Sequence, residues 1–209
     1  MDTDPDTIRL RVVPSPHRFS QAISEGDGIS VIAAVEDAES ARAAAEQGAE
    51  GLVVAGSVAG LPEDSPPVLW RGEGTPAVAR AAGADACLLE PDSLDDEGVE
   101  RLERLNDEAS DLGLDCVVRV RDEEELDAVL ERLDPEILLL SGDRPNGDEA
   151  PIDAVLRLLG NVPAGKLAVA DVEVSNRDEI AELERAGVDA VIVSAARVGA
   201  LVGAAPPEV

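Results

Sequence analysis

The stretch from residue 113 to 142 decides the fold: GLDCVVRV (113–120), RDEEELDAVLERLD (121–134) and PEILLLSG (135–142). Its first and third segments hold short apolar runs, which suit parallel strands that are covered on both faces. In the middle segment, apolar residues recur at spacings of three and four with acids between them, the pattern of an amphipathic helix. An Asp-Pro pair ends this helix, because proline restricts the residue before it. The stretch therefore predicts a strand–helix–strand unit.

The rest of the chain repeats this unit. Apolar runs of strand length recur eight times, and amphipathic segments lie between most of them. The second and third runs are joined only by SVAGLPEDSP (57–66), so the helix there is expected to be short or missing. Eight strands alternating with helices are what a (β/α)8 TIM barrel requires. The expected strands are 29–35, 51–56, 67–72, 86–91, 115–120, 136–142, 167–172 and 190–195.

An open, doubly wound sheet is the alternative fold, but it would place a glycine-rich phosphate turn after the first strand. VEDAES (35–40) occupies that place and has no glycine. We therefore predict a single-domain α/β barrel over residues 29–203, with a lead-in segment at 1–28 and a tail at 204–209. The lead-in is expected to hold a short strand at 8–13 and a short helix at 16–26, and to cap one end of the barrel.

Four helix exits share one signature, a glycine followed two residues later by an acid: GAEGLVV at 48, GADACLL at 83, GLDCVVR at 113 and GVDAVIV at 187. The glycine suits the left-handed residue that ends a helix. The acid is expected at the start of the next strand.

Three residues with reactive side chains are interpreted as structural. His17, the single histidine, lies in the lead-in, and a catalytic role for it is not favoured because no nearby group is expected to orient its ring. Cys87 and Cys116 lie one residue out of phase in the repeat on neighbouring strands. Their side chains are therefore expected to face opposite sides of the sheet, as buried free thiols.

Lysine and metal chemistry are not indicated. Lys166, the only lysine, precedes its strand and so belongs at the end of the barrel opposite an active site, which excludes a Schiff-base mechanism. No group of residues has metal-ligand spacing, and no cofactor is indicated. A divalent cation held by Asp143 and Asp171 stays open, although nothing argues for it.

The charge balance is extreme. The chain has 45 acids against 17 bases, a net charge of −28, which predicts a solvated acidic surface and suggests a halophilic source. Nucleic acid and anionic membranes are poor partners for such a surface. The sequence has no apolar run of about 18 residues and no signal-peptide core, so we expect a soluble cytoplasmic protein.

The candidate site lies at the carboxyl ends of the barrel strands, where TIM barrels carry their functional groups. One hypothesis is a polar pocket that binds a small anion through arginines, with a carboxylate as proton acceptor. The other, slightly favoured, is an ion-pair cluster that closes the end of the barrel, because charges among apolar positions are costly unless paired. The candidate ligand-binding residues are Arg71, Arg119, Ser141 and Ser194, and the candidate catalytic residues are Asp171 and Glu90.

Three segments carry a family resemblance: GADACLLE (83–90), LGLDCVVRVRDEEELDAVLERLDPEILLLSGDR (112–144) and AGVDAVIVSAARV (186–198). They resemble the second half of indole-3-glycerol-phosphate synthase, a phosphate-binding (β/α)8 barrel of tryptophan biosynthesis. The likeness covers roughly residues 29–203 and is strongest from 83 to 143. It implies the barrel fold.

The chain departs from this family at the working residues. The family's glutamate and lysine at the end of the first strand align with Ala34 and Glu36. Its third-strand lysine aligns with Arg71, which keeps the charge but not the acidity of a proton donor. Its fifth-strand glutamate aligns with Arg119, a reversal of sign. Later positions differ too: the sixth-strand asparagine and the seventh-strand glutamate–serine pair align with Ser141, Asp171 and Val172.

The phosphate-binding glycines of the family are also replaced. After strands seven and eight this chain has Glu173 and Ser194-Ala195, and the added glutamate opposes a phosphate. Ring closure needs a general acid and a general base, so the resemblance implies the fold and argues against that activity.

Three functions are weighed, of which the least favoured is the ring closure of the family itself. The first is a diverged, non-catalytic barrel that binds a small anionic ligand or a protein partner, in a regulatory or scaffold role. The second is an enzyme, a lyase or isomerase, acting on a small anionic metabolite at the carboxyl ends of the strands. Alanine-rich segments at 39–49 and 196–205 leave a homo-oligomer open as well.

Overall fold

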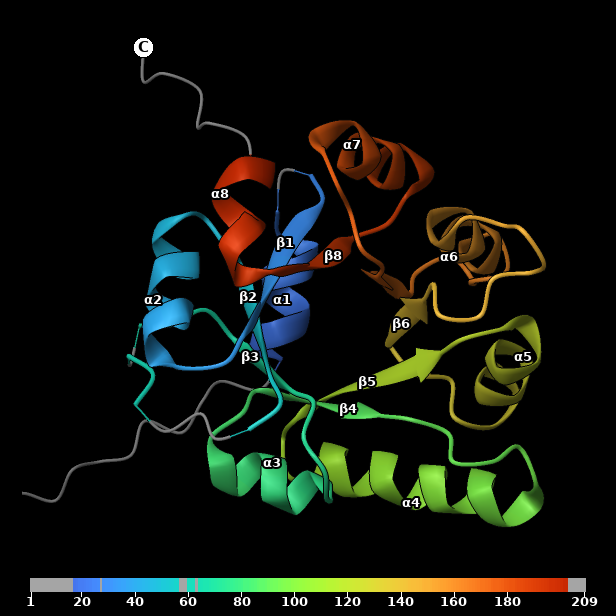
Figure 1. The fold of residues 1–209 in the computed structure, drawn as a ribbon. Coiled ribbons are helices and arrows are strands. Elements are labelled where there is room, and N and C mark those ends of the chain that lie inside the picture. Colours follow the sequence, from blue (N-terminus) through green and yellow to red (C-terminus); the bar gives the residue numbers. More distant parts are fainter. Residues whose placement is uncertain (1–16, 27, 57–59, 63, 203–209) are drawn as a thin grey trace, which may run out of the picture.

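The computed structural model describes residues 17–26, 28–56, 60–62 and 64–202, and it forms a closed barrel of eight parallel strands in sequence order (Figure 1). The barrel and all eight predicted strands are confirmed, each within two residues at either end. The strands are β1 (Ser30–Val35), β2 (Gly51–Val54), β3 (Val68–Trp70), β4 (Ala86–Leu89), β5 (Asp115–Val120), β6 (Ile137–Ser141), β7 (Leu167–Asp171) and β8 (Ala190–Ser194).

Helices surround the strands (Figure 1). Between β2 and β3 the described residues contain no helix, which agrees with the short connection predicted there. The helices are α1 (Arg18–Ser24), α2 (Ala38–Glu46), α3 (Pro76–Ala82), α4 (Asp96–Asp111), α5 (Glu123–Arg132), α6 (Pro151–Leu159), α7 (Arg177–Ala186) and α8 (Val198–Leu201), with a 3-10 turn, η1 (Ala195–Arg197), before the last.

The repeated glycine–acid signature has a structural explanation. The glycines at 48, 83, 113 and 187 all have left-handed φ angles, between 68° and 100°, as predicted for helix ends. Three of the acids then accept hydrogen bonds at the starts of strands or helices. Asp85 accepts from the backbone amide of Val68, and Asp189 accepts from that of Ala168. These acids join neighbouring strands at the end of the barrel where the strands begin, here called the amino end.

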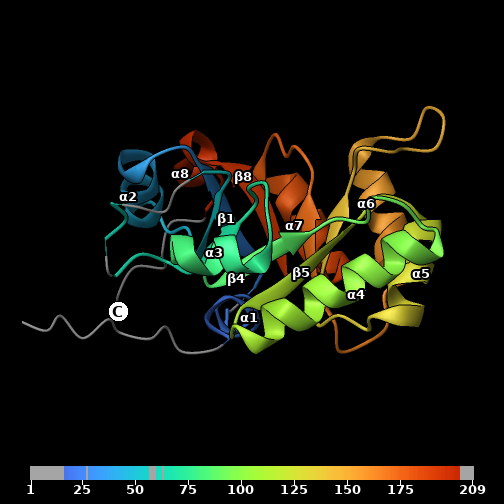
Figure 2. The ribbon, with the colours of Figure 1, turned by 90° about the horizontal axis from the view of Figure 1, so that it is seen from below.

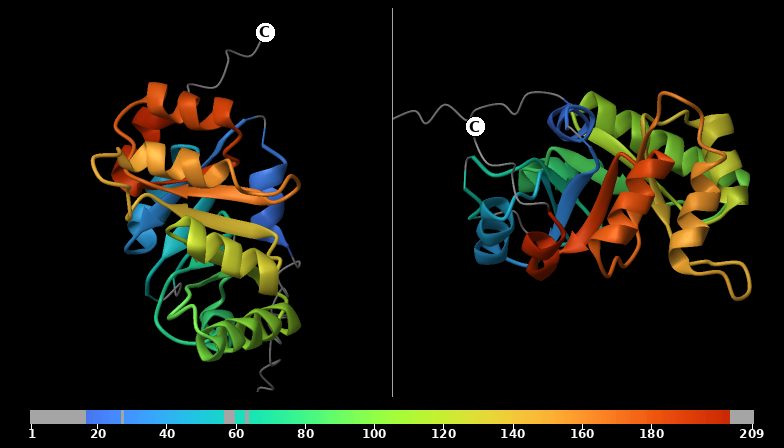
Figure 3. Two further views of the ribbon diagram at one scale, coloured as in Figure 1. Left: turned by 90° about the vertical axis from the view of Figure 1, so that its right-hand side faces the viewer. Right: turned by 90° about the horizontal axis from the view of Figure 1, so that it is seen from above.

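Inward-facing side chains fill the barrel in apolar layers, and outward-facing ones pack against the helices. Helix α1 lies across the amino end (Figures 2 and 3). Its Phe19 and Ile23, 0% and 4% exposed, join the interior cluster. The predicted strand at 8–13 and the tail at 204–209 lie outside the described residues. The other members of the interior cluster are Ile32, Val53, Leu69, Ala86, Val117, Ile137, Leu139, Val169, Ala190 and Ile192.

Asp115 ties α1 to the barrel. Its Oδ2 accepts from the backbone amides of Phe19 and Ser20, both at 3.0 Å, so a β5 side chain supplies the cap of a helix about 95 residues away in sequence. Its Oδ1 lies 2.9 Å from Nδ1 of His17. The expectation that nothing would orient the His17 ring was therefore wrong, because the orienting group comes from a distant strand. Lys166 pairs with Asp134 beside the start of β7, away from the carboxyl end, as predicted.

The relative placement of the two cysteines corrects a prediction. Cys87 and Cys116 are paired in register on β4 and β5 and both lie in the outer layer, not on opposite faces. The repeat aligns Asp85 with Asp115, but the barrel staggers neighbouring strands by one residue and pairs Ala86 with Asp115 instead. Both thiols are free, and burial raises the pKa of Cys87 to about 12 and raises that of Cys116 as well.

Candidate functional site

The carboxyl mouth, defined here as the end of the barrel where the strands finish, is a polar layer on top of the apolar interior. Side chains alternate along a strand, so each polar residue lies two positions beyond an inward-facing apolar one. Arg71 follows Leu69 in this way, and Arg119 follows Val117. All six predicted site residues occupy such positions: Arg71, Glu90, Arg119, Ser141, Asp171 and Ser194.

Asp171, at the end of β7, is bound by two arginines from distant strands. A guanidinium nitrogen of Arg71 lies 2.8 Å from Oδ2 of Asp171 and a second lies 3.5 Å from Oδ1. Arg119 approaches the same Oδ2 to 3.7 Å. The carboxylate is 18% exposed, so it is largely removed from water and its charge is balanced by these partners.

Arg119 is the centre of this network. Its guanidinium donates to Glu90 at 3.1 Å and to the buried hydroxyl of Ser141 at 3.0 Å, and it also pairs with Asp143. The Arg119 side chain is only 12% exposed, and its Nε is buried without a hydrogen-bond partner. Five of the six predicted residues thus form one ion-pair network, with Asp143 as an added member.

This geometry limits what the two predicted proton acceptors can do. Both oxygens of Asp171 accept from Arg71, and Oε1 of Glu90 accepts from Arg119, so each carboxylate already serves as the partner of a guanidinium. Ser141 is fully buried beneath Arg119 and faces no open space. Glu36, the acid that directly follows β1, is exposed and forms no ion pair in the described part of the chain. The network therefore resembles a structural cluster more than an acid–base pair.

A pocket of about 310 Å³ opens beside the network, between β1, β7 and β8. Arg71 and Asp171 form one side of it, and Ser194, exposed at the end of β8, forms another. The remaining lining residues are Ala34, Val172, Glu173, Val174, Ile192, Val193 and Arg197. The mouth thus combines the two arrangements weighed from the sequence: arginines paired with acids, and an open cavity next to them.

Arg197 is the residue of this pocket that sequence reasoning missed. It lies on η1, three residues beyond β8, and its guanidinium donates to the backbone carbonyl of Ser175 at 2.5 Å. Among the described residues no carboxylate pairs with it. One feature of the sequence could have identified Arg197: it is an arginine directly after the last strand, in a chain that has few bases. TIM barrels often bind phosphate groups at this place.

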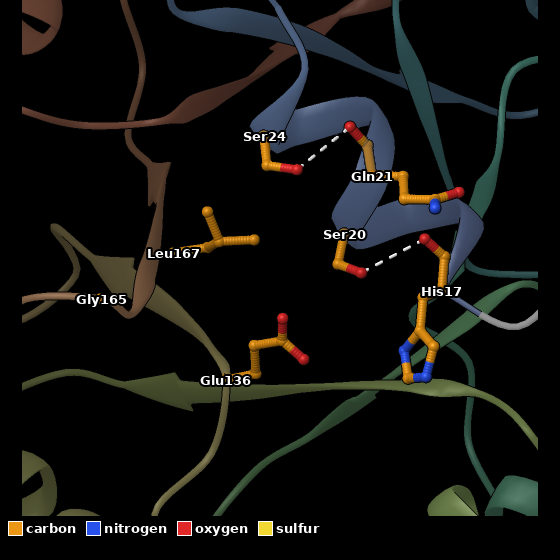
Figure 4. Close-up of a pocket in the computed structure, with 7 residues that line it drawn as sticks. All are labelled: His17, Ser20, Gln21, Ser24, Glu136, Gly165 and Leu167. Carbon is orange, nitrogen blue, oxygen red and sulfur yellow. Dashed lines mark hydrogen bonds between the residues drawn. The ribbon is translucent and has the colours of Figure 1, made fainter.

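A second hollow, of about 430 Å³, lies at the amino end under α1 (Figure 4). One wall is the polar face of α1, with side chains at helical spacing: His17, Ser20, Gln21 and Ser24. Glu136, Gly165 and Leu167 form the other wall (Figure 4). The hydroxyls of Ser20 and Ser24 donate to the backbone carbonyls of His17 and Gln21. These hydroxyls therefore stabilise the local helical turn and are not free to donate to a ligand in the hollow.

The described residues contain neither a candidate metal site nor a helix that could span a membrane. No three or more His, Cys, Asp or Glu side chains in 17–26, 28–56, 60–62 and 64–202 are grouped so that they could hold a metal ion. Nor does any helix of that part have the length and apolar character needed to cross a membrane.

The fold and the mouth together define a single-domain (β/α)8 barrel protein with an ion-paired carboxyl end and an adjoining pocket. The chain belongs to the indole-3-glycerol phosphate synthase family, since that family's model matches residues 77–200. It is 35% identical over 118 residues to the indole-3-glycerol phosphate synthase of Variovorax paradoxus (strain S110), covering 56% of this chain and 43% of that protein. The enzyme of the same name from Salinibacter ruber (strain DSM 13855 / M31) is 36% identical over 119 residues, covering 55% and 41%.

The matched region thus spans less than half the length of these curated relatives. Among solved structures, thiamine phosphate pyrophosphorylase from Pyrococcus furiosus is similar, with a TM-score of 0.57 and 19% identity. That similarity covers 82% of this chain and 88% of the solved one, and at this identity it supports the fold alone.

Proposed function

We propose that this protein binds a small anionic metabolite in the pocket of the carboxyl mouth and does not catalyse the ring closure of its family. The observation that carries the proposal is the engagement of Arg119, Asp171 and Glu90 with one another. Ring closure requires one group that donates a proton and one that removes it, whereas arginine is a poor proton donor and the two acids of this network are paired with arginines. A binding role that is regulatory or structural follows.

The pocket provides the means of binding an anion. Arg197 brings a guanidinium that no carboxylate neutralises among the described residues, and the hydroxyl of Ser194 lies exposed in the same lining. Arg71 adds a second cation at the inner side, although Asp171 balances it. Arginine binds carboxylate, sulfate and phosphate groups through paired hydrogen bonds, so any of these fits the site chemically.

A second candidate function is catalysis by a lyase or isomerase on such a metabolite. One observation favours it: Asp171 lies in the pocket lining, so a bound ligand would contact its carboxylate. In that case ligand binding would have to displace Arg71 or Arg119 from Asp171 and free a lone pair for proton transfer.

A thermal-shift titration tests the binding proposal. Phosphate or sulfate at about 100 times the dissociation constant is expected to add about 2.7 kcal/mol to the free energy of unfolding. Arg197→Gln should lose this specific gain, whereas Arg42→Gln, an exposed arginine of α2 outside the pocket, should retain it. Because these anions also stabilise proteins by exclusion from the surface, the specific effect is the difference between the two variants.

Incubation with the family's anthranilate-derived phosphosugar tests the catalytic part. We expect no indole product, and its appearance at an enzymatic rate would contradict the proposal. Chemical conversion of a bound anion, abolished in Asp171→Asn, would favour the lyase or isomerase instead.

We further propose that the protein works in the salt-rich cytoplasm of a halophile. With a net charge of −28, repulsion among surface carboxylates opposes the compact state, and salt screens it. The melting temperature should therefore rise by at least about 5 °C between about 0.1 M and 2 M KCl, equivalent to roughly 1–2 kcal/mol for a chain of this size. An unchanged melting temperature, with circular dichroism showing a folded protein at both salt concentrations, would argue against this origin.

A further inference from the structure

The pocket holds a carboxylate as well as a guanidinium. Glu173 follows the end of β7 by two residues, lies in the pocket lining and is exposed. No hydrogen bond or ion pair involves its carboxylate within the described residues. It contrasts with Asp171, two positions earlier, whose charge Arg71 and Arg119 balance. Glu173 is therefore the acid of this pocket that retains capacity for a cation.

Arg197 presents the opposite charge from another element. It extends from η1 after β8, while Glu173 lies on the loop after β7, and the two do not form an ion pair with each other. The Arg197 guanidinium and the Glu173 carboxylate thus line the same cavity without being paired with each other. Between and around them the lining is partly apolar, from Val172, Val174 and Ile192.

The two opposite charges of the pocket weaken the binding of any ligand that carries a single charge, whether negative or positive. A plain anion at Arg197 lies in the same small cavity as the Glu173 carboxylate, and like charges that line one small cavity repel. A plain amine is repelled by Arg197 for the same reason. A ligand that carries both groups, joined by a short hydrocarbon spacer, satisfies both. The volume of about 310 Å³ is at the low end for ligand pockets, which favours a small molecule.

We propose that the ligand is a small zwitterion, with its anionic group at Arg197 and Ser194 and its protonated amine at Glu173. This inference rests on the proposed function, because it assumes that the mouth binds an anion. It adds that Glu173, which would weaken the binding of a plain anion, selects ligands that also carry an amine.

Matched pairs of ligands test this inference by isothermal titration calorimetry in about 1 M KCl. Each pair differs by an amine: phosphoethanolamine against ethyl phosphate, taurine against ethanesulfonate, and β-alanine against propionate. For at least one pair the amine-bearing member is expected to bind the wild-type protein at least about 10-fold more tightly, equivalent to about 1.4 kcal/mol.

Two variants then test which side chain binds the amine of the ligand and which binds its anionic group. Glu173→Gln should bind both members of the responding pair with similar affinity, since it removes the repulsion of the plain anion and the attraction of the amine together. Arg197→Gln should weaken both members. Glu182→Gln, an exposed acid of α7 outside the pocket lining, should behave as wild type.

The outcomes separate the two proposals. If no member of any pair binds the wild-type protein, the proposed anion-binding function fails and this inference fails with it. If plain anions bind as tightly as their amine-bearing partners, or if Glu173→Gln keeps the preference for the amine, the zwitterion inference is overturned while anion binding stands.

Discussion

Replacing Arg119 with methionine is expected to lower the free energy of unfolding by about 3 kcal/mol, measured by chemical denaturation in molar KCl. Methionine has nearly the length of arginine, so the loss reports the charge and hydrogen bonds more than a cavity. The reason is the position of Arg119 in the mouth, 12% exposed, where its guanidinium contacts three carboxylates and the hydroxyl of Ser141, and only Asp171 has a second arginine partner. Without it those acids repel one another in a partly buried layer.

A matched control distinguishes the loss of the Arg119 network from the loss of an ordinary exposed ion pair. Arg132 pairs with Glu103 on the exposed surface between α5 and α4, so Arg132→Met should destabilise the protein far less. If the two variants lose similar stability, the mouth network is not structural and its arginine is available for a ligand. If Arg119→Met is destabilised and still binds phosphate with wild-type affinity, stability and binding belong to different arginines, as we propose.

Replacing Asp115 with alanine is expected to cost about 3 kcal/mol of unfolding free energy as well, and to release α1 from the barrel. The Asp115 side chain is 2% exposed and accepts from two backbone amides of α1 and from the ring of His17. Alanine leaves the two amides without their acceptor in a buried place, each a cost of about 1–3 kcal/mol. Phe19, which fills the amino end of the interior, then loses its anchor.

Asp189→Ala is the appropriate comparison. Asp189 accepts one backbone amide at the same end of the barrel, from Ala168 at 2.7 Å, so about 1 kcal/mol is expected. Limited proteolysis should cut Asp115→Ala near residues 17–26 while the Asp189 variant stays intact there. Equal stability losses and equal protection would show that α1 is held by its apolar side chains alone.

Much of the fold could be predicted because the information is local. The 3.6-residue spacing of the helices, the short apolar runs of the strands, the glycine at four helix exits and the spacing of the units all lie within about 30 neighbouring residues. The candidate site could be predicted in part for the same reason. Alternation along β5 and β7 places Arg119 and Asp171 inward, and the ends of parallel strands meet at one edge.

Several features could not be predicted, because they depend on how separate strands meet. The pairing of Cys87 with Cys116 follows from the stagger of a closed barrel, which no repeat alignment contains. The orientation of His17 depends on Asp115, 98 residues away. Arg197 lines the pocket from η1, and its guanidinium donates to the carbonyl of Ser175, which lies on the loop after β7.

The sequence by itself determined the barrel, its strands and helices, the place of the mouth and the acidic character of the chain, since each follows from composition or from periodicity along the chain. Only the tertiary structure decided that the mouth acids and arginines engage one another, and that a cavity remains between β1, β7 and β8. Ion pairing and cavity shape depend on distances between residues about 30 to 160 positions apart in sequence, and three-dimensional closure of the barrel sets those distances.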